Sequence, residues 1–271
     1  MEVTFWGTRG SIPVSGAKYV EFGGNTPCLQ IGLESTTDTI ILDSGSGVRE
    51  LGIRLVQTKA THSRVIHLFL THAHWDHIQG FPFFPPAFMP DFKLNIYCTK
   101  DARTILDRQM SAPFFPVGLD VMASTKVFHL LQPREAIAIA EATLRHVPLP
   151  HPQESTAFRV EERGKSIVFA TDTEHAPDHI NESLRDLAEG ADALIYDAQY
   201  TSEEYSAGKQ GWGHSTYAEA VKLARAAGVK RLVLYSHDPG HDDEMLRKIE
   251  AAAQEQFPNT VAARDGMKLV L

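Results

Sequence analysis

The stretch His72-Ala73-His74-Trp75-Asp76-His77 follows the apolar run 65–70 and places four metal-binding side chains within six residues. Imidazole nitrogens and carboxylate oxygens are ligands that suit Zn²⁺, Mn²⁺ and Fe²⁺. Because the stretch leaves the end of a predicted strand, the strand supplies rigidity and the loop lets the ligands converge. The density of ligand types disfavours accidental surface histidines, so the stretch predicts a metal centre in an α/β protein.

One tetrahedral ion cannot take all four ligands of this loop. His72 and His74 are two residues apart and can face one metal, whereas the adjacent Asp76 and His77 are expected to point away from that pair. Two ions are therefore predicted, and they need further ligands. The best candidates are polar residues at the ends of other predicted strands, namely His151, Asp172 and His237.

Length and composition limit the kind of protein. The 271 residues are 43% hydrophobic, and no Gly/Ser-rich or charged linker divides them, so a single domain over residues 1–271 with two similar β-α halves is expected. The net charge of −8 gives no basic surface for extended nucleic-acid binding. A small anionic substrate held by metal ions agrees with this charge.

The environment can also be predicted from composition. The two cysteines, Cys28 and Cys98, form no CxxC pair, which favours a reducing, cytoplasmic setting. The N-terminal residues lack a basic region followed by an apolar stretch, and no run approaches about 18 apolar residues. Neither export nor membrane insertion is expected.

Strand and helix patterns alternate along the chain. Short runs rich in β-branched and aromatic residues predict strands at 3–6, 28–33, 39–42, 65–70, 94–98, 155–160, 166–171, 193–197 and 231–236. Apolar residues at helical spacing predict helices at 48–57, 102–110, 216–227 and 243–256, the third opening with Thr216 and Glu219 in a capping-box pattern.

Two segments, 81–90 and 112–116, combine proline with phenylalanine. Their proline content predicts no regular structure, whereas their aromatic content resists full exposure. Loops packed on the core are one interpretation, and a wall of the active site or a subunit interface is the other.

Several motifs together resemble the metallo-β-lactamase superfamily, and within it the phosphodiesterase branch that includes ribonuclease Z and the phosphoribosyl cyclic-phosphate and cyclic-nucleotide phosphodiesterases. The resemblance covers nearly the whole chain and rests on residues 7–11, 23–26, 42–45, 72–77, His151 with Phe158-Arg159, 170–173, 213–216 and Ser236-His237. It implies a four-layer αββα sandwich with the active site at one edge of the two sheets.

The resemblance also implies a ligand set. One ion would be held by His72, His74 and His151, and the second by Asp76, His77 and His237, with Asp172 bridging the two. Zn²⁺ is the first expectation, and Mn²⁺ or Fe²⁺ are the alternatives, because a ligand set without thiolate accepts all three.

The expected catalytic residues are Asp76, His214 and Asp197. The resemblance matches His214 to a histidine that contacts the scissile phosphate, which makes it the candidate leaving-group acid, and Asp197 to the carboxylate that orients this histidine. A polar residue preceding a helix N-cap is the alternative interpretation of His214. Asp43 is expected to brace the His72 loop by hydrogen bonds, and contacts of His175 or Asn25 with substrate stay open.

The leading hypothesis is a dinuclear phosphodiesterase that uses a metal-activated hydroxide on a small or cyclic phosphodiester, such as a cyclic nucleotide or cyclic sugar phosphate. Processing of tRNA 3′ ends is less expected, because ribonuclease Z enzymes usually carry a long arm between the residues that match His151 and Asp172. Only residues 152–171 lie there in this chain. Hydrolysis of a carboxylic ester, thioester or lactone and a non-catalytic accessory or regulatory role are the alternatives. A homodimer is expected, with residues 81–88 as a candidate interface.

Overall fold

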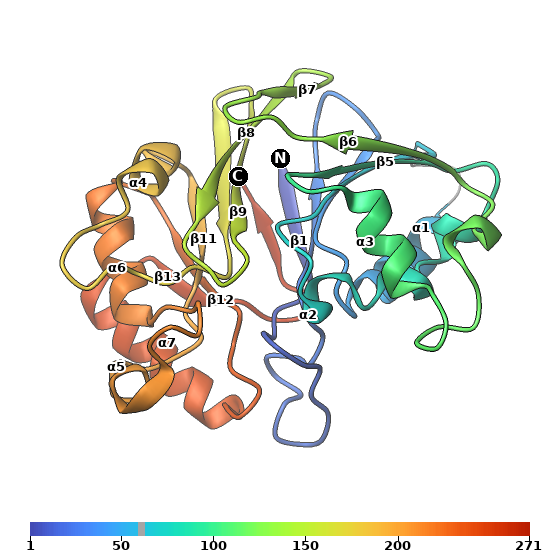
Figure 1. The fold of residues 1–271 in the computed structure, drawn as a ribbon. Coiled ribbons are helices and arrows are strands. Elements are labelled where there is room, and N and C mark those ends of the chain that lie inside the picture. The colour runs from blue at the N-terminus through green and yellow to red at the C-terminus, as the bar shows by residue number, and fades with distance from the viewer. Residues whose placement is uncertain (59–62) are drawn as a thin grey trace. The chain divides into compact units, whose positions relative to one another are not determined.

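The computed structural model describes residues 1–58 and 63–271, and their contacts divide the chain into two compact units. Unit 1 comprises Met1–Gly7, Asn25–Gln132 and Gly266–Val270, and unit 2 comprises Thr8–Gly24, Pro133–Asp265 and Leu271. Each unit contains one seven-stranded sheet, and Figure 1 labels many of the helices and strands.

The sheet of unit 1 has the strand order β14-β1-β2-β3-β4-β5-β6. Strands β14 to β3 pair antiparallel and β3 to β6 pair parallel. The strands are β1 (Glu2–Gly7), β2 (Cys28–Gly32), β3 (Thr39–Leu42), β4 (Val65–Phe69), β5 (Lys93–Cys98), β6 (Thr125–Leu130) and β14 (Lys268–Val270). The helices are α1 (Val48–Gln57), α2 (Trp75–Ile78) and α3 (Ala102–Gln109), with short 3₁₀ turns at Phe81–Phe83, Pro85–Phe88 and Leu119–Val121.

The proline-rich segment 81–90 belongs partly to the core of unit 1. Phe81 and Phe84 are buried with Leu51 of α1, whereas the neighbouring Phe83 and Phe88 are exposed. The prediction that this segment lacks regular structure is wrong for its two 3₁₀ turns, because proline is tolerated in a first helical turn, where its missing N–H is not needed.

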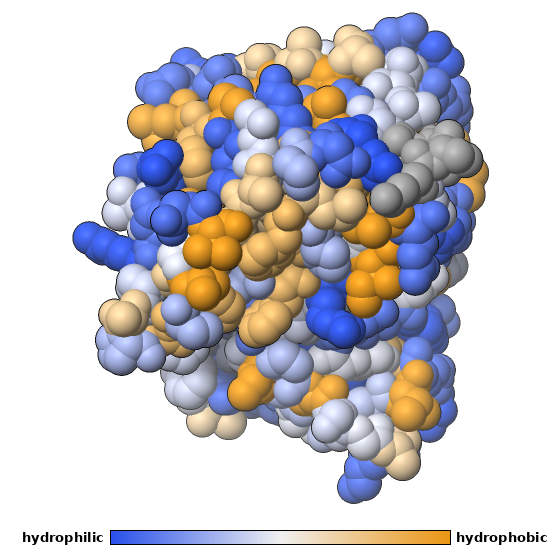
Figure 2. Space-filling view, turned by 90° about the vertical axis from the view of Figure 1, so that its right-hand side faces the viewer, coloured by the Kyte–Doolittle hydropathy of each residue, from blue (hydrophilic) through white to orange (hydrophobic). Residues whose placement is uncertain are grey.

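Exposed hydrophobic side chains are numerous on unit 1. Figure 2 shows hydrophobic surface gathered in patches on one face of the molecule. The exposed apolar residues in segments 81–90 and 112–122 are Phe83, Phe88, Phe114, Val117 and Val121.

The sheet of unit 2 has the order β13-β12-β11-β10-β9-β8-β7, antiparallel from β7 to β10 and parallel from β10 to β13. Its strands are β7 (Ile137–Ile139), β8 (Ala142–Leu149), β9 (Ser155–Glu162), β10 (Lys165–Ala170), β11 (Ala193–Asp197), β12 (Leu232–Tyr235) and β13 (Thr260–Ala262). Its helices are α4 (Glu182–Ala188), α5 (Ser202–Glu204), α6 (Tyr217–Ala226) and α7 (Asp243–Gln256), with a π turn at Tyr205–Lys209.

Capping side chains fix where the two longest helices of unit 2 begin. Thr216 accepts a hydrogen bond from the Glu219 N–H at the start of α6, and Asp242 accepts one from the Met245 N–H at the start of α7. The apolar faces of both helices belong to the core of unit 2, which also holds Leu232 and Leu234 of β12. No helix in the described ranges is long and apolar enough to cross a membrane.

Candidate metal centre

Three residues just beyond strand ends have an unusual backbone. Asp43 after β3 has φ 62°, Asp172 after β10 has φ 54°, and Ser236 after β12 has φ 59°. Non-glycine residues rarely adopt this left-handed conformation, which costs about 1 kcal/mol or more and is concentrated at functional sites. In each unit, therefore, strained turns accompany the predicted ligands.

Asp43 fixes the ligand loop of unit 1. The His77 Nδ1–H donates to Asp43 Oδ2 at 2.8 Å, and both side chains are fully buried. Asp43 Oδ1 also accepts from the Thr71 N–H at 2.8 Å. The prediction that Asp43 braces this loop is thus confirmed. Burial raises the pKa of Asp43, and its contact with His77 opposes that rise.

The imidazoles of unit 1 lie close together around the short helix α2. The ring centroids of His72 and His74 are 4.4 Å apart, and those of His72 and His77 are 4.2 Å apart. The turn of α2 places the His77 ring beside that of His72, but the ligand atoms of the loop still fall into two groups, His72 with His74 and Asp76 with His77. Asp76 Oδ2 lies 3.4 Å from His77 Nε2, so the predicted ligands of the loop form two neighbouring pairs.

In unit 2, His151 follows β8 and is oriented by a backbone carbonyl. Its Nδ1–H donates to Gly213 O at 2.7 Å, and its Nε2 lies 3.7 Å from Asp172 Oδ2. Gly213 has φ 88°, and a Cβ added there would collide with the His151 ring. The glycine is therefore needed for this close approach.

Asp197 and His214 form the buried pair that the sequence predicted. His214 Nδ1–H donates to Asp197 Oδ2 at 2.7 Å, and the same oxygen accepts from the Asp172 N–H at 3.0 Å. Asp197 Oδ1 accepts from the Ser215 N–H at 3.0 Å. One ligand atom from each of Asp172, Asp197 and His214 lies within 4.8 Å of the others.

His237 follows β12 and is buried as a neutral imidazole. Burial lowers its pKa to about 3, and the charge of Arg9 adds to the effect. Its Nε2–H donates to Ala263 O at 2.9 Å, which leaves the lone pair on Nδ1. A neutral ring with one nitrogen fixed in this way is the form in which histidine binds a metal.

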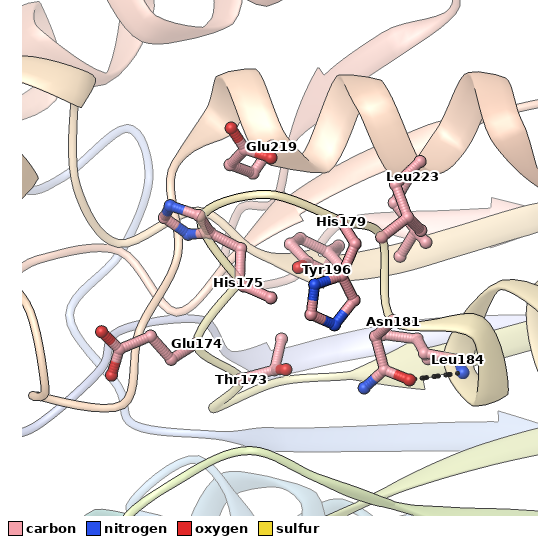
Figure 3. A pocket seen from close by; sticks show the side chains of 11 residues that line it. Thr173, Glu174, His175, His179, Asn181, Leu184, Tyr196, Glu219 and Leu223 are labelled. Atoms are coloured by element: carbon pink, nitrogen blue, oxygen red, sulfur yellow. Dashed lines mark hydrogen bonds between the residues drawn. The ribbon is translucent and has the colours of Figure 1, made fainter.

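The remaining candidates occupy different places. His175 lines a pocket of unit 2 together with Tyr196 and Glu219 of α6 (Figure 3), and its Nδ1 lies 3.0 Å from Ser215 Oγ. In unit 1, Asn25 Oδ1 accepts a hydrogen bond from Ser46 Oγ at 3.0 Å, so the amide helps to hold its own loop.

Each unit contributes side chains of the kinds that bind divalent ions. Within unit 1 the loop supplies three imidazoles and a carboxylate, and His77 is held at Nδ1 by a carboxylate. Within unit 2 the side chains of His151, His214 and His237 each have one ring nitrogen held by a carbonyl or carboxylate. Such hydrogen bonds fix the tautomer and the ring orientation of metal-binding histidines.

Comparison with known proteins gives the family. Residues 38–237 match the family described as Beta-lactamase superfamily domain. The chain belongs to this superfamily. The metallo-β-lactamase fold protein YhfI from Bacillus subtilis has a similar structure, with a TM-score of 0.73 and 19% identity over 99% of this chain and 98% of that chain. The predicted fold class is thereby confirmed.

Relatives of this superfamily member include nucleases. It is 37% identical to Ribonuclease Z of Brevibacillus brevis over 106 residues. This aligned segment covers 38% of this chain but only 31% of that protein. The chain therefore spans about a third of the length of that relative. Ribonuclease Z of Methanothermobacter thermautotrophicus is 27% identical over 328 aligned positions that cover 98% of this chain and 95% of the relative.

Proposed function

We propose that this superfamily member is a hydrolase of small or cyclic phosphodiesters that works with two divalent ions. The residues that would hold these ions, as the resemblance implies, are His72, His74 and His151 for one ion and Asp76, His77 and His237 for the other, with Asp172 as a shared ligand. When bound, such ions acidify a water molecule and neutralise charge on a phosphoryl oxygen. Asp76 is in this proposal both a ligand and a catalytic residue.

The observation that carries the phosphodiester proposal is the Asp197–His214 pair. Because Asp197 binds His214 at Nδ1, the imidazole presents Nε2 towards Asp172, whose Oδ2 is 4.0 Å away. A protonated Nε2 there is placed to give its proton to a leaving oxygen, and the buried carboxylate stabilises the imidazolium.

Processing of tRNA 3′ ends is a second candidate, favoured by relatives that are named Ribonuclease Z. The interval between His151 and Asp172 argues for a smaller substrate, because β9, a tight turn and β10 fill it almost entirely. The alignment of 328 positions also exceeds the 271 residues of this chain by 57, so the Methanothermobacter protein has segments that this chain lacks.

The test is hydrolysis by metal-reconstituted protein of bis-p-nitrophenyl phosphate, a cyclic nucleotide, a lactone and a tRNA precursor. Cleavage of the first two supports the proposal, whereas turnover of the lactone alone would favour the ester alternative. Cleavage of the precursor alone would favour tRNA processing, and no turnover would favour a non-catalytic role.

Replacement of the proposed acid gives a sharper result. His214→Ala is expected to lower kcat for the cyclic nucleotide by about 10²- to 10⁴-fold at unchanged metal content, because the leaving ribose oxygen loses its proton donor. His129→Ala, which changes a histidine stacked on Tyr97 in unit 1, is the matched control. Full activity of His214→Ala would show that another group protonates the leaving oxygen.

A further inference from the structure

The segment 205–213, which leads into His214, is held by one carboxylate. Glu174 Oε1 accepts hydrogen bonds from the Tyr205 hydroxyl and the Gly211 N–H, both at 2.7 Å, and Oε2 accepts from the Gly213 N–H at 2.9 Å. In Figure 3 this carboxylate points away from Tyr196. Because these donors outweigh the effect of burial, the pKa of Glu174 is lowered. The segment is thereby fixed before any substrate arrives.

Trp212 lies between the two clamped glycines and is 57% exposed. The Lys209 ammonium lies 4.1 Å from the centroid of the indole, a cation–π contact that holds the ring in one orientation. Among the residues that the structure describes, no carboxylate lies within ion-pair distance of Lys209. Trp212 and Lys209 therefore present an oriented aromatic face with a positive charge beside it, on a protein of net charge −8.

This aromatic and basic pair adjoins the proposed catalytic groups of unit 2. Gly211 lines an open hollow together with His151, Glu174 and His175. Lys209 Nζ also lies 5.4 Å from the ring centroid of Tyr200, whose ring is 5.9 Å from that of His214. Trp212 is therefore connected to the proposed acid through the side chains of Lys209 and Tyr200.

We propose that Trp212 and Lys209 form a subsite for the base of a nucleotide, so that nucleoside phosphodiesters are preferred to cyclic sugar phosphates without a base. The inference rests on the proposed function and names its substrate class. Stacking on an exposed indole suits any nucleobase, because every base has a π face. Lys209 holds the indole and offsets the charge of the phosphate attached to the stacked nucleoside.

The test compares a nucleoside 2′,3′-cyclic phosphate with the matching ribose cyclic phosphate that has no base. Trp212→Leu keeps an apolar side chain without a ring, and is expected to raise the KM of the nucleoside substrate about tenfold at unchanged kcat. The KM of the base-free substrate is expected to stay within about twofold, and Trp212→Phe should fall between wild type and Trp212→Leu. Equal changes for both substrates, or no change for either, would overturn the inference.

Lys209 has its own variant and control. Lys209→Met is expected to raise the KM of the nucleoside substrate severalfold, whereas Lys248→Met, on α7 and paired with Glu244, should leave it unchanged. Equal KM values for these two variants would show that Lys209 does not contribute to the subsite.

Binding of adenosine monophosphate separates this inference from the proposed function. If wild-type protein cleaves no phosphodiester, the proposed function fails, and calorimetric titration with adenosine monophosphate still decides the subsite. Binding that is about tenfold weaker in Trp212→Leu supports the subsite. Equal affinities, or no binding to wild type, would overturn it.

Discussion

Asp43 is the residue through which β3 controls the ligand loop of unit 1. It holds His77 by a buried hydrogen bond and the loop backbone through Thr71, and its own backbone has a positive φ. A carboxylate in this position fixes the His77 tautomer and increases the basicity of the ring nitrogen that faces a metal.

Asp43→Asn is therefore expected to lower metal affinity by about 10- to 100-fold, because the amide removes the negative charge behind His77. Competition with a chromophoric chelator measures the affinity. Asp38→Asn is the matched control, since Asp38 pairs with His67 outside the cluster, 3.5 Å apart. Wild-type affinity of Asp43→Asn would show that the pair does not support a metal ligand.

The candidate ligands at strand ends could be predicted from the sequence, because an apolar run followed by His or Asp is a local signal. Glu174 and Gly213 were missed because they act through backbone groups distant in sequence. Glu174 binds an N–H 39 residues away, and Gly213 receives a hydrogen bond from a histidine 62 residues away. In the sequence, the close approach of His151 to the backbone before His214 was indicated only by the glycine at position 213.

At the scale of elements, Asp192 joins two strands of unit 2. Its carboxylate accepts from the Ser166 N–H on β10 and from Lys230, which precedes β12, both at 2.8 Å. Burial opposes ionisation of Asp192, but the hydrogen bonds from Lys230 and Ser166 outweigh it and lower its pKa. The ionised form therefore stabilises the folded state.

Asp192→Asn is expected to lower the free energy of unfolding by about 1–3 kcal/mol at pH 7. Because the folded-state pKa is lowered, this stabilisation is complete above the unfolded value of about 3.9 and is lost as the pH falls through the folded value. Urea unfolding of metal-free protein at pH 7 and pH 3 measures it. A difference from wild type that is as large at pH 3 as at pH 7 would contradict this linkage.

Elements with strong local signals were predicted well from the sequence. Helices α1 and α7 and strands β3 and β11 have the predicted bounds, because their apolar spacing and flanking residues are local. Strands β13 and β14 have three residues each, and they are strands only because β12 and β1 pair with them. A short window of sequence does not show which distant strand will pair with it, so these two strands could not be predicted.

At the scale of the whole molecule, we propose a homodimer formed through unit 1, because a monomer rarely exposes so many apolar side chains. Light scattering is expected to give twice the chain mass of 30.0 kDa. Phe83→Asp with Phe114→Asp, at positions 58% and 79% exposed, should give a monomer. Val20→Asp, at a 78% exposed position in unit 2, should stay dimeric. Wild-type protein that is monomeric at every concentration would contradict this arrangement.

Metal removal is expected to destabilise the protein, because metal that binds only the folded chain adds to its stability. At a free metal concentration of 100 times Kd, the contribution is about 2.7 kcal/mol. Calorimetric melting with and without a chelator measures the loss as a lower Tm. An unchanged Tm would show that the ligand clusters bind no ion tightly.

The route of the chain through the two units has a consequence for biosynthesis. In unit 1, β1 gains its outer neighbour only from β14, more than 260 residues later. In unit 2, the stretch Thr8–Gly24 is held by Asp243, which accepts from the Phe22 N–H, and by Asp265, which accepts from the Gly24 N–H. A ribosome-bound chain therefore exposes one unfinished sheet edge and one unanchored stretch, Thr8–Gly24, until residues 243–270 have emerged. No single cut in the gene separates the two units.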